Sequence, residues 1–166
     1  NKSYLTLMPC NLYGPNDNFD SKKSHFLPAL IKKVIENKKK DKKFIDIWGT
    51  GKPKREVMHV DDLASAIGFI LQKKIKNDKK PLNLIKKSSV INVGSGIEYS
   101  VENFARMICK ILNNKNKLSF NKDYPDGTMR KILDSTLMKS LGWKPKINII
   151  DGINETILWY EKNYLN

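Results

Sequence analysis

Short β-prone segments alternate with helical patterns along most of this chain, and this alternation constrains the fold more than any other feature. Residues 3–7 (SYLTL) are β-prone and partly alternating, whereas residues 25–37 repeat apolar side chains at helical spacing. Strands are expected at 3–7, 44–48, 55–60, 90–93 and 118–120, and helices at 25–37, 135–141, 148–163 and after Asp61 and Ser100. Such an order favours an α/β fold with parallel pairing in at least part of the sheet.

The connections between these elements carry predictions of their own. The "GTGKP" segment turns the chain between residues 44–48 and 55–60, so these two strands could pair as a hairpin. Asp61 and Ser100 are suitable N-caps for the helices that follow them, and Gly142 suits the position just after a helix C-terminus. The polar stretch 73–89 is expected to be a loop with the character of an insertion.

Composition narrows the class of protein. With 166 residues and 40% hydrophobic content, the chain can bury a core, either as one domain or as a large piece of a bigger protein. Its net charge of +14 comes mostly from Lys that travels with Asn and Ile, without the aromatic-interleaved stripe of a nucleic-acid binder. We therefore expect no nucleic-acid partner, although some of these cations could face an anionic small molecule. No apolar run approaches the length of a membrane span.

The two cysteines and two histidines have limited chemical potential when taken singly. Cys10 and Cys109 lack metal-ligand spacing, which predicts inert packing residues, a reducing compartment and a cytoplasmic location. His25 follows the stretch "PCNLYGPNDNFDSKKSH" (9–25) and begins a helix, where it could act as a general acid or base or be an ordinary surface histidine. His59 is expected to be packed and bonded to backbone, and Asp61 beside Asp62 to cap a helix rather than to form an acid pair.

Three glycine-containing motifs leave two interpretations each. "NVGSGIEYS" resembles a phosphate-binding loop but has Tyr99 where a third glycine belongs, so a tight turn is the alternative. "WGTGKPKRE" places Trp48 and Arg55 around a turn, which suits a nucleotide base and a diphosphate, or a hairpin with a packed Trp. "YPDGTMRKILD" puts Asp126 in a turn ahead of Arg130 and Lys131, as a binding loop or a solvated turn.

The order of the motifs is more informative than any one of them. "MPCNLYGPNDNF", "SHFLPALIKK", "WGTGKPKREVMHVDDLA", "INVGSG", "PDGTMRKILD" and "LGWKP" follow one another as in the C-terminal half of GDP-L-fucose synthases. The chain resembles that family of extended short-chain dehydrogenase/reductases over nearly its whole length. The resemblance implies the last strands and helices of a Rossmann-type sheet plus a small α/β substrate-binding lobe. Residues 1–14, 56–75 and 88–95 would belong to the nucleotide-binding sheet, and residues 15–55 and 96–166 to the lobe.

The resemblance also implies a function and a set of site residues. These enzymes epimerise GDP-4-keto-6-deoxy-mannose at C3 and C5 and reduce its C4 ketone with NADPH, and no metal is involved. His25 matches the acid of the epimerisation and lies near the nicotinamide. The residues implied at the cofactor are Pro9, Cys10, Asn11, Leu12 and His25, and those implied at the GDP-sugar are Lys33, Trp48, Arg55, Asp126 and Lys131. The family often has Arg at the position of Lys33 and commonly Thr at that of Cys10.

Other family features belong to the N-terminal half and have no match in this chain. They are the Gly-rich dinucleotide fingerprint, the catalytic Ser, the Tyr-x-x-x-Lys pair and the cysteine that partners the histidine. We therefore expect the chain to be a C-terminal fragment that neither binds NADPH tightly nor catalyses reduction alone. The family forms dimers largely through helices of the other half, so this chain could be monomeric. The alternatives are another nucleotide-sugar epimerase or dehydratase, and a non-catalytic basic binding module.

Overall fold

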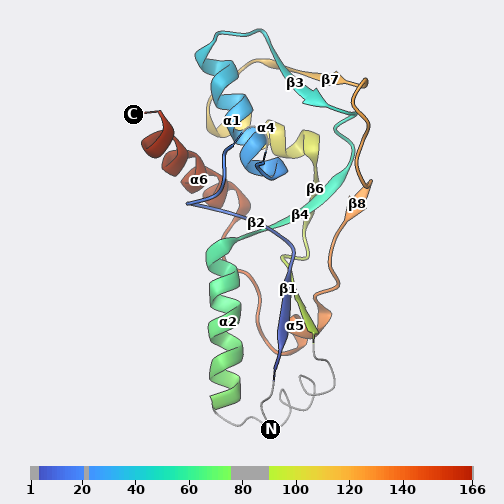
Figure 1. Ribbon diagram of the computed structural model, residues 1–166, viewed down its shortest axis with the longest axis vertical. Helices are drawn as coiled ribbons and strands as arrows, with labels where there is room; N and C mark the ends of the chain where they lie inside the picture. Colours follow the sequence, from blue (N-terminus) through green and yellow to red (C-terminus); the bar gives the residue numbers. More distant parts are fainter. Residues whose placement is uncertain (1–3, 21–22, 76–89, 166) are drawn as a thin grey trace. The chain divides into compact units, whose positions relative to one another are not determined.

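The computed structural model describes residues 4–20, 23–75 and 90–165 (Figure 1). The chain divides into two compact units, each assembled from three stretches of sequence. Unit 1 comprises Asn1–Leu12, Glu56–Ile97 and Ile132–Ile147, and unit 2 comprises Tyr13–Arg55, Glu98–Lys131 and Asn148–Asn166. Residues 132–147 were expected in the substrate-binding lobe, whereas Met138, Leu141 and Trp143 pack into the core of unit 1.

Unit 1 is built on a parallel strand pair. Strand β1 (Thr6–Pro9) pairs with β5 (Val90–Val93), and Leu7 lies opposite Ile91. Helices α2 (Val60–Ile75) and α5 (Thr136–Ser140) contribute to the same apolar core. The buried members of this core are Met58, Ala66, Ile70, Ile91, Val93, Met138, Leu141 and Trp143. A parallel pair packed with helices is the arrangement that the alternating sequence pattern predicts.

Unit 2 has a second parallel pair and three helices. Strand β3 (Phe44–Trp48) pairs with β7 (Lys117–Asn121), and the two run side by side in Figure 1 although a long stretch of chain separates them. The helices are α1 (Phe26–Lys39), α4 (Val101–Ile111) and α6 (Ile149–Tyr164). Their apolar faces supply the core residues Leu27, Ile31, Val34, Phe104, Ile108, Ile153 and Ile157, all at most 2% exposed.

A further sheet has the strand order β2-β4-β6 and is formed by β2 (Asn11–Tyr13), β4 (Lys54–His59) and β6 (Glu98–Ser100). Strand β8 (Arg130–Lys131) pairs with β4 in parallel, so that Lys54 lies opposite Arg130 and Arg55 opposite Lys131. The predicted hairpin between residues 44–48 and 55–60 is therefore wrong. Both strands form, but β3 pairs with β7 because distant strands offer partners that a local turn signal cannot reveal.

The helix boundaries agree with the local signals except at α2. The hydroxyl of Ser100 accepts a hydrogen bond from the N–H of Asn103 at 3.1 Å, which confirms the predicted N-cap of α4. Helix α2 instead begins at Val60, so Asp61 lies in its first turn, and the Nδ1 atom of His59 accepts the Asp61 N–H at 3.3 Å. His59 is 1% exposed, as expected for a packed residue bonded to backbone.

Some predictions concern segments that the structure treats differently or does not describe. The loop predicted over 73–89 falls mostly on residues outside the described ranges, and residues 73–75 end α2.

The carboxylate of Asp62 is buried and accepts the N–H groups of Lys146 and Ile147, so it anchors a distant segment. In the part of the chain that the structure describes, no helix is long and apolar enough to cross a membrane, and no His, Cys, Asp and Glu side chains cluster as metal ligands do.

Candidate nucleotide-binding site

Two loops of unit 2 are hydrogen-bonded to each other at several points, and we call this pair of loops the clamp: residues 49–53 after β3 and residues 122–129 after β7. The N–H of Gly49 donates to the carbonyl of Asn121 at 2.8 Å. The N–H and hydroxyl of Thr50 donate to the two carboxylate oxygens of Asp126 at 2.8 and 2.6 Å. Gly49 has a φ of +76°, and a Cβ there would collide with the Asp126 carboxylate, so both the turn and the close approach need glycine.

The clamp brings two aromatic rings together. The ring of Tyr124 stacks on the indole of Trp48 with a centroid separation of 4.4 Å and an interplanar angle of 9°. Both rings remain accessible, since Trp48 is 60% and Tyr124 43% exposed. The Nζ atom of Lys33 lies 4.8 Å from the Trp48 ring centroid and donates to the Asp46 carbonyl at 2.9 Å. Exposed stacked rings beside a cation form a surface that suits a planar, anionic ligand.

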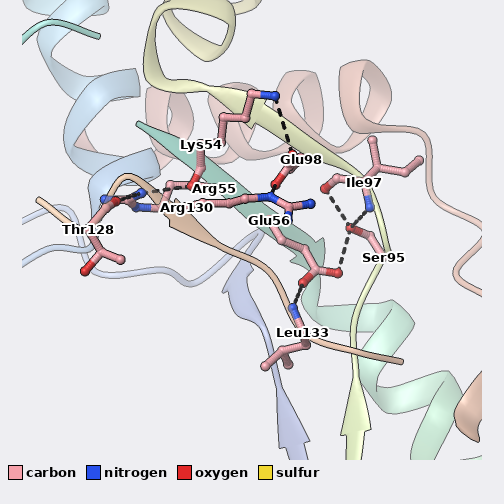
Figure 2. Close-up of polar contacts among 9 residues, drawn as sticks. All are labelled: Lys54, Arg55, Glu56, Ser95, Ile97, Glu98, Thr128, Arg130 and Leu133. Atoms are coloured by element: carbon pink, nitrogen blue, oxygen red, sulfur yellow. Dashed lines mark hydrogen bonds and ion pairs between the residues drawn. The ribbon is translucent and has the colours of Figure 1, made fainter. Parts of the chain in front are cut away.

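Arg55 fastens the far end of the same loop. Its Nη1 atom donates to the carbonyls of Lys54 at 2.8 Å and Thr128 at 2.6 Å (Figure 2). Strand pairing continues the connection, because the N–H of Lys54 donates to the Met129 carbonyl at 2.8 Å. A guanidinium has five N–H donors, and those on Nε and Nη2 of Arg55 make no hydrogen bond within the described ranges. Arg55 can therefore hold the loop and still present donors to an anion.

The two cation pairs of β4 and β8 differ in their partners. Lys54 and Arg130 are opposite each other and both bind Glu98, with Nζ at 3.5 Å and Nε at 2.8 Å from its carboxylate oxygens (Figure 2). Successive side chains in a strand point to opposite faces, so Arg55 and Lys131 lie together on the other face. Lys131 makes no ion pair with any residue that the structure describes. On one face of this strand pair the two cations therefore share the carboxylate of Glu98, whereas on the other face no ion pair engages the two cations within the described residues.

Asp126 and Lys33 are engaged in contacts within unit 2. The hydrogen bonds from Thr50, first from its hydroxyl and then from its N–H, lower the pKa of Asp126, so its carboxyl group stays ionised and keeps the clamp closed. Burial lowers the pKa of Lys33 and the nearby Asp46 opposes that shift. Four of the five residues implied at the GDP-sugar thus meet around the clamp or the strands that flank it, namely Trp48, Arg55, Asp126 and Lys131, and Lys33 contacts the Trp48 ring.

His25 occupies the N-cap position of α1 and also belongs to unit 2. Its backbone is extended, its side chain is exposed and it makes no capping hydrogen bond, so the imidazole is available for proton transfer. The loop before it is anchored by Phe19, which packs on Tyr160 with a centroid separation of 4.5 Å. Burial raises the pKa of the nearby Asp17 carboxyl, and the charge of His25 opposes that shift. The Oδ2 atom of Asp17 is buried without a hydrogen-bond partner among the described residues.

In unit 1 the glycine turn after β5 is filled by a carboxylate. Glu56 is 1% exposed, and its Oε1 accepts the Gly96 N–H at 2.6 Å while Oε2 accepts the Leu133 N–H at 2.8 Å. The hydroxyl of Ser95 lies 3.4 Å from Oε1 (Figure 2). A Cβ at Gly94 would collide with the same carboxylate. The amide that could have faced a phosphate is therefore occupied, and this turn is structural.

Four of the five residues implied at the cofactor, Pro9, Cys10, Asn11 and Leu12, lie in unit 1. Pro9 ends β1 and Cys10 follows it, with its N–H donating to the Val93 carbonyl at 3.0 Å. These residues therefore stand at the carboxyl end of a parallel strand, which is where open α/β sheets bind nucleotides. Burial, reinforced by the charge of Glu56, raises the pKa of the Cys10 thiol to about 12, so it stays neutral. Segment 9–12 thus presents no charged side chain at the end of this strand, and Glu56 occupies the Gly96 amide of the 94–96 turn.

Several residues of these sites were not found from the sequence. Thr50, Tyr124 and Glu98 act through partners more than 30 positions away, so no local spacing indicates them. The sequence gives only a weak indication that Glu56 is buried: it is an acidic residue directly before the apolar residues Val57 and Met58 of the same strand. A buried acid in such a strand needs donors around it, and here they come from distant loops.

Comparison of the chain with known proteins identifies the family to which it belongs. Residues 1–94 match the model of the NAD dependent epimerase/dehydratase family, so the chain belongs to that family. The chain is 41% identical to GDP-L-fucose synthase 1 of Arabidopsis thaliana over 96% of its own length and 46% of that protein. It is 37% identical to GDP-L-colitose synthase of Yersinia pseudotuberculosis, over 96% of the chain and 49% of the relative.

A solved structure supports the same placement. The GDP-mannoheptose C4 reductase MlghC of Campylobacter jejuni, with NADP bound, superimposes with a TM-score of 0.75 and is 35% identical, covering 95% of this chain and 52% of that one. The α/β fold class and the similarity to GDP-L-fucose synthases expected from the sequence are thereby confirmed. The chain spans about half the length of the curated relatives that it matches.

Proposed function

We propose that this chain forms the GDP-sugar-binding part of an NADP-dependent enzyme that converts GDP-4-keto-6-deoxy-mannose to GDP-L-fucose by epimerisation and reduction. The observation that carries the proposal is the cation pair Arg55 and Lys131, which makes no ion pair within the described residues and lies on the strands that border a loop bearing exposed stacked rings. The fork of N–H donors on Arg55 together with the positive charge of Lys131 suits a diphosphate, and exposed aromatic rings suit a base.

The nucleotide part of this proposal has broader support than the sugar part. The names of the three similar proteins share a GDP-sugar and differ in the sugar, which is fucose, colitose or mannoheptose. In unit 2 the proposed nucleotide contacts are Arg55 and Lys131 to the diphosphate and Trp48 to the base, with Lys33 beside the Trp48 ring. Asp126 acts at least by holding the clamp closed through Thr50.

His25 is the proposed acid of the epimerisation. Protons next to a ketone can be removed, and inversion of that carbon requires a donor on the opposite face of the enolate. An exposed imidazole without a capping bond can deliver such a proton. NADP, when bound, would supply the reducing equivalent for the C4 ketone. Pro9, Cys10, Asn11, Leu12 and His25 are the residues of this chain proposed to lie at its nicotinamide end.

Reduction is proposed to need groups beyond these 166 residues. No Tyr-x-x-x-Lys pair and no Gly-rich dinucleotide fingerprint stands in the sequence, and the 94–96 turn is closed to phosphate by Glu56. We therefore expect the chain alone not to oxidise NADPH. We also propose a cytoplasmic enzyme and a dimer for the complete protein.

Calorimetry on this chain tests the proposal. We expect GDP-mannose to bind more tightly than UDP-glucose, and Arg55→Gln to weaken GDP-mannose about 10- to 100-fold, since hydrogen bonds to charged groups contribute about 1.5–3 kcal/mol. Lys54→Gln is the matched control, because Lys54 carries the same charge on the adjacent position but faces Glu98. Equal weakening by both variants, or equal affinity for the two sugar nucleotides, would contradict the proposed site.

A further inference from the structure

The Trp48–Tyr124 stack is fixed by hydrogen bonds on both sides of Tyr124. Before it in sequence, Asn121 accepts the Gly49 N–H with its carbonyl and the Asp123 N–H with its side-chain oxygen at 3.0 Å. After it, Asp126 accepts both hydrogen-bond donors of Thr50. The segment that carries Tyr124 is therefore attached to the residues that immediately follow Trp48, and its ring is brought onto the indole.

The strand register supports the same arrangement. Trp48 is the last residue of β3 and lies opposite Asn121, the last residue of β7, so the two loops leave a parallel pair at the same level. Parallel strands that end together deliver their following loops to one edge. Gly49 allows the Asp126 carboxylate to approach the first loop closely. The stack thus follows from the backbone arrangement and does not depend on a chance meeting of two side chains.

An exposed tryptophan would otherwise sample several rotamers. Trp48 is 60% exposed, so few core contacts restrict its side chain, and ordering such a side chain on binding weakens affinity. Tyr124 covers one face of the indole almost in parallel. The ring orientation is then set before any ligand arrives, and the ordering cost falls on folding instead of binding.

We propose that Tyr124 is a positioning residue for Trp48, holding the indole in the orientation in which it meets the planar base of a nucleotide. The inference rests on the proposed function and deepens it, because it gives a role at the base subsite to Tyr124, to which the sequence motifs assign none. The aromatic ring of Tyr124 carries the role, so Tyr124→Phe should preserve it and Tyr124→Ala should remove it.

The test combines a structural readout with binding. The chain is labelled with 5-fluorotryptophan and observed by ¹⁹F NMR, with the Trp48 resonance assigned through Trp48→Phe. Calorimetry with GDP then compares the starting protein with Tyr124→Phe, Tyr124→Ala and Trp48→Ala. We expect Tyr124→Ala to shift the Trp48 resonance and to weaken GDP about 3- to 10-fold, while Tyr124→Phe changes neither. The Trp159 resonance serves as the folding control, because Trp159 also belongs to unit 2 and packs on Phe19 away from the clamp.

The outcomes separate this inference from the proposed function. If Trp48→Ala weakens GDP but Tyr124→Ala leaves both the affinity and the Trp48 resonance unchanged, the positioning role is refuted while the nucleotide site stands. If Trp48→Ala also leaves the affinity unchanged, the base subsite itself is wrong and the inference falls with it. Tyr124→Phe behaving like Tyr124→Ala would show that the hydroxyl matters, which also overturns the stacking argument.

Discussion

Glu56 is predicted to be the side chain on which the stability of unit 1 depends most among its polar residues. Its two carboxylate oxygens accept backbone N–H groups of Gly96 and Leu133 at 2.6 and 2.8 Å, and these belong to segments far apart in sequence. Glu56→Gln places an amide NH₂ against one of these donors and should cost about 1–3 kcal/mol. Glu56→Ala leaves both donors without an acceptor and should cost about 2–6 kcal/mol, a large fraction of a typical domain's stability.

Urea denaturation measures these costs. Fluorescence is followed in a background that retains only Trp143, which is 5% exposed in unit 1, with Trp48 and Trp159 replaced by Phe. The control is Glu36→Gln, the same chemical change in a surface pair with Lys40 at 3.8 Å, which should alter stability by no more than about 0.5 kcal/mol. If Glu56→Gln costs no more than Glu36→Gln, the carboxylate does not anchor the turn and the reasoning is refuted.

Three other predictions concern titratable groups. The pKa of Cys10 is raised from 9.0 to about 12, so the contribution of its neutral thiol to stability should be intact below pH 9 and lost as the pH rises toward 12. The thiol should therefore resist iodoacetamide at pH 8, and rapid alkylation of the folded protein would disprove the raised pKa. Burial raises the pKa of Asp17, so the stability that the protonated carboxyl group contributes should be present below pH 3.8 and lost as the pH rises through the higher folded pKa. His25→Gln should raise the pKa of Asp17 further, and an unchanged carboxyl titration by ¹³C NMR would count against the Asp17–His25 interaction. Hydrogen bonds from Thr50 lower the pKa of Asp126, so the stability that the ionised carboxylate contributes is present above pH 3.8 and lost as the pH falls through the lower folded pKa. Thr50→Val should raise the pKa of Asp126, and an unchanged pKa would exclude the contact between Thr50 and Asp126.

The sequence predicted correctly those features that depend on interactions between residues close together in the chain. Ser100 was recognisable as an N-cap because its hydroxyl bonds to a residue three positions later. The helix at 148–163 was recognisable from its apolar spacing and forms as α6 (Ile149–Tyr164). The prediction of Asp61 as an N-cap was wrong because the helix begins at Val60, two residues before the start that a cap at Asp61 implies.

Features that depend on distant partners could not be predicted in the same way. The pairing of β3 with β7 joins residues about 73 positions apart, since Phe44 lies opposite Lys117, and the nearby turn suggested a hairpin instead. The Thr50–Asp126 contact is likewise 76 positions long. Trp48 and Arg55 were found as candidates from their residue types, but Tyr124 was not, because nothing in its own neighbourhood relates it to Trp48.

The central claim is that Arg55 and Lys131 form a diphosphate site, and the most direct measurement compares the affinities of GDP and GMP. The comparison uses the starting chain, the double variant Arg55→Gln/Lys131→Gln and the control double variant Lys54→Gln/Arg130→Gln, whose cations face Glu98. The account predicts that GDP binds more tightly than GMP in the starting chain and in the control, and that this advantage disappears in the first double variant. An advantage that survives in Arg55→Gln/Lys131→Gln would contradict the account.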